Sequence, residues 1–274
     1  YNLSLKAKKM IEKYTKNLAL ELNTIGLINI QFAMKNNKIY VIEVNPRASR
    51  TIPFISKIKD IPFAKYAAQV SIGKKLVELN FKEKNIRFIA VKKPVFPFNK
   101  FPNQNIFLSP EMKSTGEVIG FDKHLGSAYA KAEYGSGNNL PLKGRVFISV
   151  NDTDKQDILK IARDLDEMNY KIIATKGTAE ALSGNGISCD TMFKVGEGRP
   201  NIVDCIKNDD VQMIINTPLG AQSRYDEYEI GKAAIKHNIH VVTTISGAQA
   251  ILRGIRMIKN KNLNYMSLQK IFKN

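Results

Sequence analysis

The chain has 274 residues, 43% of them hydrophobic, and a formal net charge of +17, which allows two ordinary domains with a core each. Its two cysteines, Cys189 and Cys205, lie in no CxxC or Cys/His cluster, which argues against a zinc site or a disulfide framework. No run of about 18 apolar residues and no signal-peptide layout occur, so we expect a cytoplasmic protein without a membrane partner.

Basic residues are unevenly distributed. Residues 1–140 carry 23 basic and 10 acidic side chains, against 19 and 15 in the rest. A basic first part suits anionic ligands or an acidic neighbouring chain, although scattered lysines on helix faces are also common as solvated surface. No recognition helix, RNA-binding motif or basic-aromatic stripe is visible, so nucleic acid is not expected as a partner.

A long amphipathic helix is predicted for residues 4–22, followed by a hairpin of two strands, residues 28–34 and 38–44. Apolar residues recur in the helix at three- and four-residue steps, at Ala7, Ile11, Tyr14, Leu18 and Leu22. Asn36 and Asn37 form the polar turn between the strands. We expect the helix to pack on the apolar face of the hairpin.

The loop length of this hairpin decides which side chains share a face. A three-residue loop, 36–38, places Gln31 opposite Glu43, on the same face as Asn45. The other face then holds the apolar side chains Ile30, Phe32, Met34, Tyr40, Ile42 and Val44. A two-residue loop would pair Gln31 with Ile42 and mix polar with apolar residues on both faces, which a half-buried hairpin avoids. We therefore predict the three-residue loop.

Residues 43–50 end the second strand and combine a carboxylate, a carboxamide and two guanidinium groups. Oxygen ligands on one strand face are what Mg²⁺ accepts alongside phosphate oxygens, and arginines supply forked donors to phosphoryl groups. The pattern therefore favours a metal-bound polyphosphate. The alternative is a solvated polar face that binds nothing.

Gln31 and residues 43–51 resemble the metal and phosphate motif of ATP-grasp ligases. They are similar in particular to the second, carbamate-phosphorylating ATP site of carbamoyl-phosphate synthase large subunits, and the similarity runs the whole length of the chain. The resemblance implies ATP as a substrate and Mg²⁺ or Mn²⁺ as the bridging ion. It assigns the metal to Gln31, Glu43 and Asn45, and the transferred phosphoryl group or carbamate to Arg47 and Arg50.

The resemblance also implies a larger parent enzyme. Such enzymes make carbamoyl phosphate, for pyrimidine and arginine biosynthesis, from bicarbonate, glutamine-derived ammonia and two ATP. The implied partners are a small glutamine amidotransferase subunit, a missing N-terminal part of the same chain, and further copies of the parent in a homo-oligomer. Because the chain starts at Tyr1 and no glycine-rich phosphate loop precedes Glu43, we expect a fragment that is inactive alone.

The rest of the first half should hold a helix over 63–72, ended by Gly73, and a strand over 86–98. Pro94 and Pro97 make an interior strand position doubtful.

A turn-rich stretch, residues 110–118, resembles the closing segment of the ligase domain, and we favour a structural hairpin there over direct chemistry. A helix over 122–134 and a linker over 135–141 follow. We therefore expect two domains, 1–137 and 138–274.

The second half alternates short strands with helices, which predicts an α/β doubly wound fold with a parallel sheet. The expected strands are residues 145–150, 171–175, 211–216 and 240–244, and the expected helices begin near Asp154, Thr178, Pro200, Tyr225 and Ser246. The fold class is thus α/β overall: a partial ATP-grasp (α+β) domain followed by this doubly wound domain.

Small polar residues stand at the ends of the predicted strands. The run 175–178 leaves a strand and opens a helix, so backbone N–H groups and two hydroxyls meet where the helix dipole favours an anion. Residues 216–218 and 243–247 end two further strands, and Lys155 and Lys194 could add cationic contacts. Each alone is more often a helix cap or turn residue. Together they favour a phosphate pocket.

Residues 142–260 resemble the methylglyoxal-synthase-like domain that is the allosteric domain of carbamoyl-phosphate synthases. By that resemblance an effector such as UMP or IMP is contacted by Ser149, Lys155, Thr175, Thr178, Lys194 and Asn216. Pro218 departs from relatives with threonine there, which removes a hydroxyl and an N–H donor. Lys93 replaces a glutamate that binds ornithine in some relatives, so ornithine activation is not expected although Thr243 matches that site.

Two other functions stay open. A methylglyoxal synthase-type lyase shares the fold, but its elimination needs a carboxylate base beside the phosphate loop, and residues 195–200 lack the expected Gly-Gly-Asp run. A non-catalytic nucleotide-binding module could describe the isolated chain. The leading prediction is the C-terminal part of a ligase, which supplies metal and phosphate ligands for carbamate phosphorylation and a nucleotide-binding regulatory domain.

Overall fold

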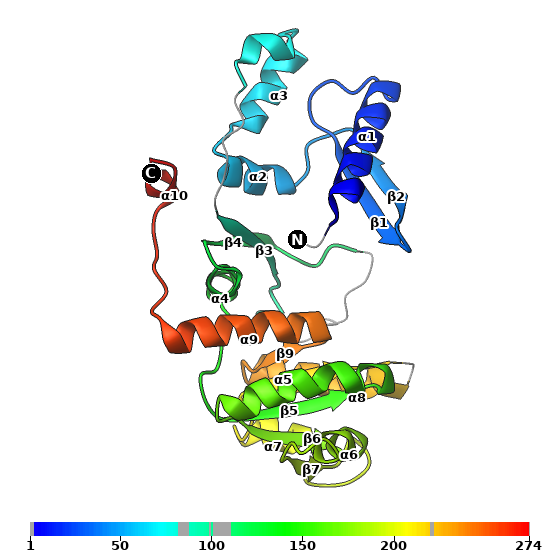
Figure 1. Cartoon of the computed structure of the whole chain (residues 1–274), viewed down its shortest axis with the longest axis vertical. Coiled ribbons are helices and arrows are strands. Elements are labelled where there is room, and N and C mark those ends of the chain that lie inside the picture. The colour runs from blue at the N-terminus through cyan, green and yellow to red at the C-terminus, as the bar shows by residue number, and fades with distance from the viewer. Residues whose placement is uncertain (1–2, 82–87, 99, 101–110, 220–221, 274) are drawn as a thin grey trace. The chain divides into compact units, whose positions relative to one another are not determined.

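The computed structural model describes the chain except residues 1–2, 82–87, 99, 101–110, 220–221 and 274 (Figure 1). It divides into two compact units, Tyr1–Arg87 with Met266–Asn274, and Phe88–Tyr265. The domain boundary expected between residues 137 and 138 lies inside the second unit. As a boundary between sequence domains it stays a prediction.

The first unit opens with the predicted amphipathic helix, α1 (Leu5–Glu21). Ser4 begins it, because its hydroxyl oxygen accepts a hydrogen bond from the backbone N–H of Ala7 at 3.2 Å. The hairpin of β1 (Asn29–Lys35) and β2 (Lys38–Asn45) follows. Helix α1 contacts β2.

The hairpin turn differs from the prediction. Lys35 pairs with Lys38, so the loop has two residues, and the three-residue loop is wrong. Asn36 and Asn37 have φ angles of 51° and 61°. Asparagine tolerates this left-handed region, and two such residues form the tight turn whose twist matches the strands.

A β-bulge nevertheless restores the predicted pairing at the end of the hairpin. Phe32 pairs with Val41, whereas Gln31 pairs with Glu43, so β2 holds one extra residue, Ile42. Gln31 and Glu43 therefore stand opposite one another, and Asn45 pairs with Asn29 on the same face.

The apolar face of the hairpin is less buried than predicted. Ile42 is 65% exposed at the bulge, and Met34 and Tyr40 are also exposed. The altered register puts Ile39 and Val41 in line with Phe32, where Tyr40 and Ile42 were expected. The expectation that Ile42 lies on an apolar face covered by the helix is therefore wrong.

The remaining elements of the first unit are α2 (Thr51–Lys59), α3 (Phe63–Ser71), the 3₁₀ helix η1 (Leu76–Leu79) and α10 (Leu268–Lys273). Helix α3 confirms the predicted one, and Gly73 follows it with φ +97°. Sequence reasoning missed α2 because Pro53 reads as a breaker. Pro53 lies in the first helical turn, where its missing N–H costs no helical hydrogen bond.

In the second unit, β3 (Ile89–Val95) pairs antiparallel with β4 (Gly116–Asp122). Pro94 is tolerated because this sheet has two strands, so each strand has an edge without a partner in it. The hairpin expected at 110–118 lies partly outside the described residues, and its described end opens β4. Helix α4 (Leu125–Gly135) packs on both strands and on α9.

A five-stranded parallel sheet forms the rest of this unit, in the order β7-β6-β5-β8-β9. Its strands are β5 (Arg145–Val150), β6 (Lys171–Thr175), β7 (Asp190–Met192), β8 (Met213–Thr217) and β9 (His240–Val242). Its helical elements are η2 (Asp152–Asp154), α5 (Lys155–Glu167), α6 (Lys176–Ser183), α7 (Ile202–Lys207), α8 (Gln222–Lys236) and α9 (Ile245–Asn260). This confirms the predicted α/β fold; the short edge strand β7 and the 3₁₀ helix η2 were not foreseen.

The sheet is buried on both faces. Val146 and Ile148 of β5 belong to one apolar cluster with residues of α5 and α9, whereas Phe147 belongs to a second cluster with residues of α7 and α8. Successive strand residues point to opposite faces, so both sets are apolar and the strand sequence is continuously hydrophobic. In the described part of the chain, no helix is both long and apolar enough to span a bilayer. The cytoplasmic location stays a prediction.

Gly120 marks the closest approach of β4 to α4. A Cβ atom there would lie 1.7 Å from the carbonyl oxygen of Ala128 and 2.7 Å from the backbone nitrogen of Ala132. These are backbone atoms, so α4 itself would have to move. We expect Gly120→Ala to lower the free energy of unfolding of this unit by about 1–3 kcal/mol or more, measured by urea denaturation. Gly116→Ala on the same strand meets no described atom within 4 Å and is the matched control. Equal stability of both variants would contradict the packing.

Candidate functional site

A pocket of about 320 Å³ lies at the carboxyl ends of β5, β6 and β8. Because these strands are parallel, their ends meet at one edge of the sheet. All six residues expected to contact an effector line it: Ser149, Lys155, Thr175, Thr178, Lys194 and Asn216. The structure thus brings together residues that are up to 67 positions apart in the sequence.

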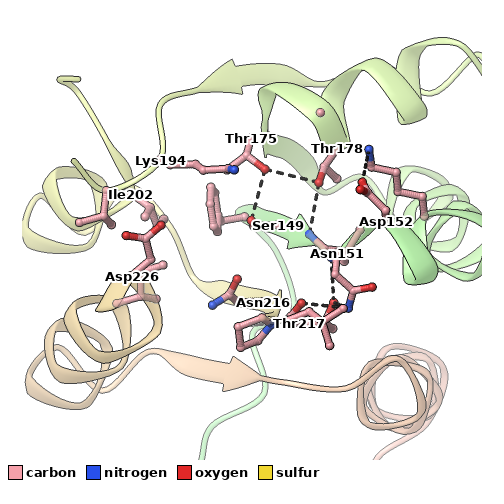
Figure 2. A pocket seen from close by; sticks show the side chains of 18 of the residues that line it. Ser149, Asn151, Asp152, Thr175, Thr178, Lys194, Ile202, Asn216, Thr217 and Asp226 are labelled. Carbon is pink, nitrogen blue, oxygen red and sulfur yellow. Dashed lines mark hydrogen bonds and ion pairs between the residues drawn. The ribbon is translucent and has the colours of Figure 1, made fainter. Parts of the chain in front are cut away.

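Hydroxyl groups form the floor of this pocket (Figure 2). The Thr175 hydroxyl lies 3.2 Å from Ser149 Oγ and 3.4 Å from Thr178 Oγ1. Thr178 Oγ1 also accepts a hydrogen bond from the backbone N–H of Val150 at 3.2 Å. Thr175 and Thr178 are buried, so their positions are fixed by the fold before any ligand binds.

The N-terminus of α6 supplies a second feature that suits an anion. Thr175 ends β6 and is the N-cap residue of α6, so the first N–H groups of that helix face the pocket edge. Gly177 lines the pocket, and a Cβ atom there would lie 3.5 Å from Lys155 Nζ. The helix start, the hydroxyl floor and a lysine therefore converge.

Two lysines bring charge to the pocket. Lys155 Nζ lies 2.7 Å from Asp152 Oδ1, and the hydrogen bond and charge of Lys155 lower the pKa of Asp152. Lys194 Nζ is 4.0 Å from Glu197 Oε1, and its side chain is 53% exposed. Figure 2 shows Lys194 extending toward Thr175 and Ser149. Lys194 is the more adaptable cation of the two.

Sequence reasoning missed Asn151, which joins two strand ends. Its Nδ2 donates to Asp154 Oδ2 at 2.8 Å and to the carbonyl oxygen of Thr217 at 3.1 Å, and its Oδ1 accepts from the N–H of Thr153. An asparagine directly after a strand and before a helix is a capping signal that could have revealed it.

Asp226 of α8 was also missed, and it faces the same space in Figure 2. Burial raises the pKa of Asp226, and the charge of Lys194 opposes that shift. No strand-end pattern marks this residue, because it comes from within a helix.

The expectation that residues 243–247 join the anion pocket is wrong. Strand β9 already ends at Val242, and the Thr244 hydroxyl caps α9 by accepting from the N–H of Gly247 at 3.1 Å. Thr243 lines a different cavity. Pro218 does line the anion pocket, where it offers neither a hydroxyl nor an N–H.

A second candidate site lies on the hairpin of the first unit. Gln31 and Glu43 are paired across the strands, and Asn45 Nδ2 donates a hydrogen bond to Glu43 Oε1. Arg47 follows in a turn, where its backbone N–H donates to the carbonyl oxygen of Asn45 at 2.8 Å. Arg50 directly precedes α2. The three proposed metal ligands therefore share one face, and both arginines lie in the connection that follows it.

Comparison with known proteins matches both parts of the chain to one enzyme family. A family model described as "Carbamoyl-phosphate synthase L chain, ATP binding domain" matches residues 1–79, and one described as "MGS-like domain" matches residues 157–243. The carbamoyl phosphate synthase large chain of Archaeoglobus fulgidus is 51% identical over 262 residues, which is 95% of this chain and 24% of that protein. The chain belongs to the carbamoyl phosphate synthase large-chain family.

Other relatives agree with this carbamoyl phosphate synthase assignment. The large chain of Pseudomonas putida is 46% identical over 96% of this chain and 25% of its own length. The "Carbamoyl phosphate synthase large chain, C-terminal section" of Aquifex aeolicus is 42% identical over 99% of this chain and 55% of its own. The chain thus spans about a quarter of the full-length large chains and corresponds to their C-terminal part.

One solved structure, a methylglyoxal synthase from Elizabethkingia anophelis NUHP1, aligns with 41% of this chain and 79% of its own at 14% identity and a TM-score of 0.35. A likeness this weak carries no argument. The carbamoyl phosphate synthase comparisons are more informative: the hairpin site lies in the segment that matches the ATP-binding domain, and Thr175, Thr178, Lys194 and Asn216 lie in the MGS-like segment.

Thr178 tests how the floor of the pocket is held. Replacing it by valine keeps the shape but leaves the buried N–H of Val150 without its acceptor. We expect Thr178→Val to lower the free energy of unfolding by about 1–3 kcal/mol, measured by urea denaturation. Thr191→Val on β7 is the control, because Thr191 is exposed. A Thr178→Val protein as stable as this control would show that the hydrogen bond contributes nothing.

Proposed function

We propose that this chain is the C-terminal part of a carbamoyl phosphate synthase large chain that phosphorylates carbamate with ATP. The observation that carries the proposal is the polar face of Gln31, Glu43 and Asn45, held by the β-bulge and followed by Arg47 and Arg50. It lies in the segment that matches the family's ATP-binding domain.

The donor set of this face fits Mg²⁺ or Mn²⁺ shared with phosphate oxygens. It offers one carboxylate and two carboxamides, and among the described residues no group of three or more His, Cys, Asp or Glu side chains could hold a metal. Mg²⁺ is commonly bound by one or two carboxylates together with substrate phosphates and water, so a single glutamate suffices. When bound, the ion would neutralise and orient the phosphate oxygens of ATP.

The arginines complete this proposed site. Arg47 and Glu43 are exposed, so each can meet a ligand without first being uncovered. The planar guanidinium groups of Arg47 and Arg50 would donate paired hydrogen bonds to the transferred phosphoryl group or to carbamate. Their role is to position the reactants and to offset charge, which is most of what phosphoryl transfer asks of a protein.

The rest of the reaction belongs to the parent enzyme. We infer that a small glutamine amidotransferase subunit supplies ammonia, and that the remaining parts of the ATP site come from elsewhere in the large chain. Because the chain spans about a quarter of its full-length relatives, we propose that it is inactive toward ATP by itself.

The pocket of the second unit is proposed to bind a nucleoside monophosphate such as UMP or IMP as an effector. Hydroxyls, a helix N-terminus and Lys194 suit the phosphate, and about 320 Å³ lies in the usual range for small-molecule sites. A lyase is less favoured, because Asp152 is paired with Lys155 and residues 195–200 hold no Gly-Gly-Asp run. Binding without turnover is therefore the reading that this pocket supports.

Glu43→Gln in the full-length parent tests the ATP site. Loss of the one carboxylate on this face should reduce ATP synthesis from carbamoyl phosphate and ADP by about 100-fold or more, because a metal contact of several kcal/mol is lost. Glu12→Gln on the exposed side of α1 is the matched control. Unchanged ATP synthesis in the Glu43→Gln enzyme would contradict the assignment of Glu43 to the metal. Steady ATP hydrolysis by the isolated 274-residue chain would contradict its proposed inactivity.

Lys194→Ala tests the effector pocket by titration calorimetry of the chain with UMP and IMP. Loss of a charge-assisted hydrogen bond should weaken phosphate binding by about 1–3 kcal/mol. Lys207→Ala is the control, because Lys207 is exposed at the end of α7 and does not line the pocket. The unmodified chain should form no methylglyoxal from dihydroxyacetone phosphate, because binding without turnover is proposed. No heat with either nucleotide, or equal affinity in the Lys194→Ala protein, would contradict the proposal and leave these residues with the role of helix caps only.

A further inference from the structure

The connection between β7 and α7, residues 193–201, is a closed loop that carries Lys194. It turns directly after β7, where the backbone N–H of Glu197 donates to the carbonyl oxygen of Lys194 at 3.2 Å. Phe193 and Asn201 form an isolated parallel bridge, which joins the two ends of the loop. Lys194 therefore follows directly after the point at which the loop closes.

The ring of Phe193 closes this loop a second time. A Cβ atom at Gly198 would lie 3.1 Å from Cγ and Cδ2 of that ring, so the ring rests on the backbone of Gly198. Asn201 Nδ2 donates to the carbonyl oxygen of Gly198 at 3.2 Å. Asn201 is buried, and its Oδ1 caps α7 by accepting from the N–H of Val203 at 3.0 Å. The far end of the loop is thus anchored in the fold, and Phe193 attaches the near end to it.

The ammonium group of Lys194 is not held tightly by an ion pair. Its side chain is 53% exposed, and Nζ lies 4.0 Å from Glu197 Oε1. An exposed pair at this distance holds a long side chain weakly. The region that the ammonium group can reach is therefore set by the backbone of Lys194. That backbone lies between Val195, which packs on an apolar cluster, and Phe193.

Phe193 can affect the anion pocket without contacting what binds there. Among the described residues, Lys194 and Val195 line the pocket, whereas Phe193 does not. Phe193 is also 50% exposed and belongs to neither apolar cluster, so the core of the unit does not depend on its ring. The contact that the structure gives the ring is the one that closes the loop.

We propose that Phe193 is a positioning residue for Lys194. Its ring, seated on Gly198, holds the Lys194 backbone where the side chain extends toward the hydroxyl floor, as Figure 2 shows for Lys194. This inference rests on the proposed anion pocket, and it adds how the pocket keeps its more adaptable cation in place. Without the ring, binding would first have to order the loop, and that cost lowers affinity.

A double-mutant cycle tests the proposal, by titration calorimetry of the whole chain with UMP and IMP. Phe193→Ala should weaken nucleotide binding by about 3- to 10-fold, because the loop is then ordered only on binding. In a Lys194→Ala background the same change should weaken binding by less than about twofold, because the ring then has no cation to position. Leu142→Ala is the matched control and should not change the affinity, because Leu142 is an exposed apolar residue that does not line the pocket.

The cycle separates positioning from a general role in folding. Phe193→Tyr retains the ring and should bind as the unmodified chain does. Unchanged affinity in Phe193→Ala, an equal loss with and without Lys194, or a Phe193→Tyr protein as weak as Phe193→Ala would overturn this inference alone. No heat from the unmodified chain with either nucleotide would overturn the proposed effector pocket as well. Where Phe193→Ala does not fold, Phe193→Val, a β-branched residue suited to extended backbone, replaces it under the same criteria.

Discussion

The parallel alignment of β5, β6 and β8 is the constraint on which the pocket proposed to bind an anion depends. Ser149 of β5 pairs directly with Asn216 of β8, and Thr175 ends β6 one position beyond the last β5–β6 pair. Each strand alone would offer one or two polar side chains, with nothing to distinguish them from helix caps. The sheet register turns three separate strand ends into one polar floor, and apolar clusters on both faces fix that register.

Strand β8 and helix α8 contribute to both cavities of the second unit. Asn216 and Ile230 line both the anion pocket and the cavity beside Lys93. A ligand in the anion pocket would therefore contact residues that also line the second cavity. The Lys93–Glu133 ion pair joins β3, which lines that cavity, to α4. A displacement of β8 or α8 would therefore act on the elements packed around that cavity, because close-packed interiors transmit strain.

Sequence reasoning found the strands that are buried runs and missed features that depend on pairing or on distance. Strands β5 and β6 were predicted to the residue because apolar runs bounded by turn residues define them. The two-residue turn at Asn36 and Asn37 was missed, yet the Gln31–Glu43 pair was right, because an unforeseen bulge at Ile42 compensates for the shorter loop. A bulge leaves no periodic signal in one strand. Asp226 was missed for a different reason: only the packing of α8 brings it to the sheet edge.

The two lysines of the anion pocket show why a net charge of +17 says little about where an anion binds. Lys155 forms an ion pair with Asp152 at 2.7 Å, and that contact lowers the pKa of Asp152. An incoming phosphate would therefore have to compete with the Asp152 carboxylate for Lys155. Lys194 is 4.0 Å from Glu197 and half exposed, so it can turn toward a ligand at little cost. Exposed ion pairs at such distances contribute little to the stability of the fold. The proposed binding of an anion would therefore rest on Lys194 and on the hydroxyl floor that the buried strands hold in place.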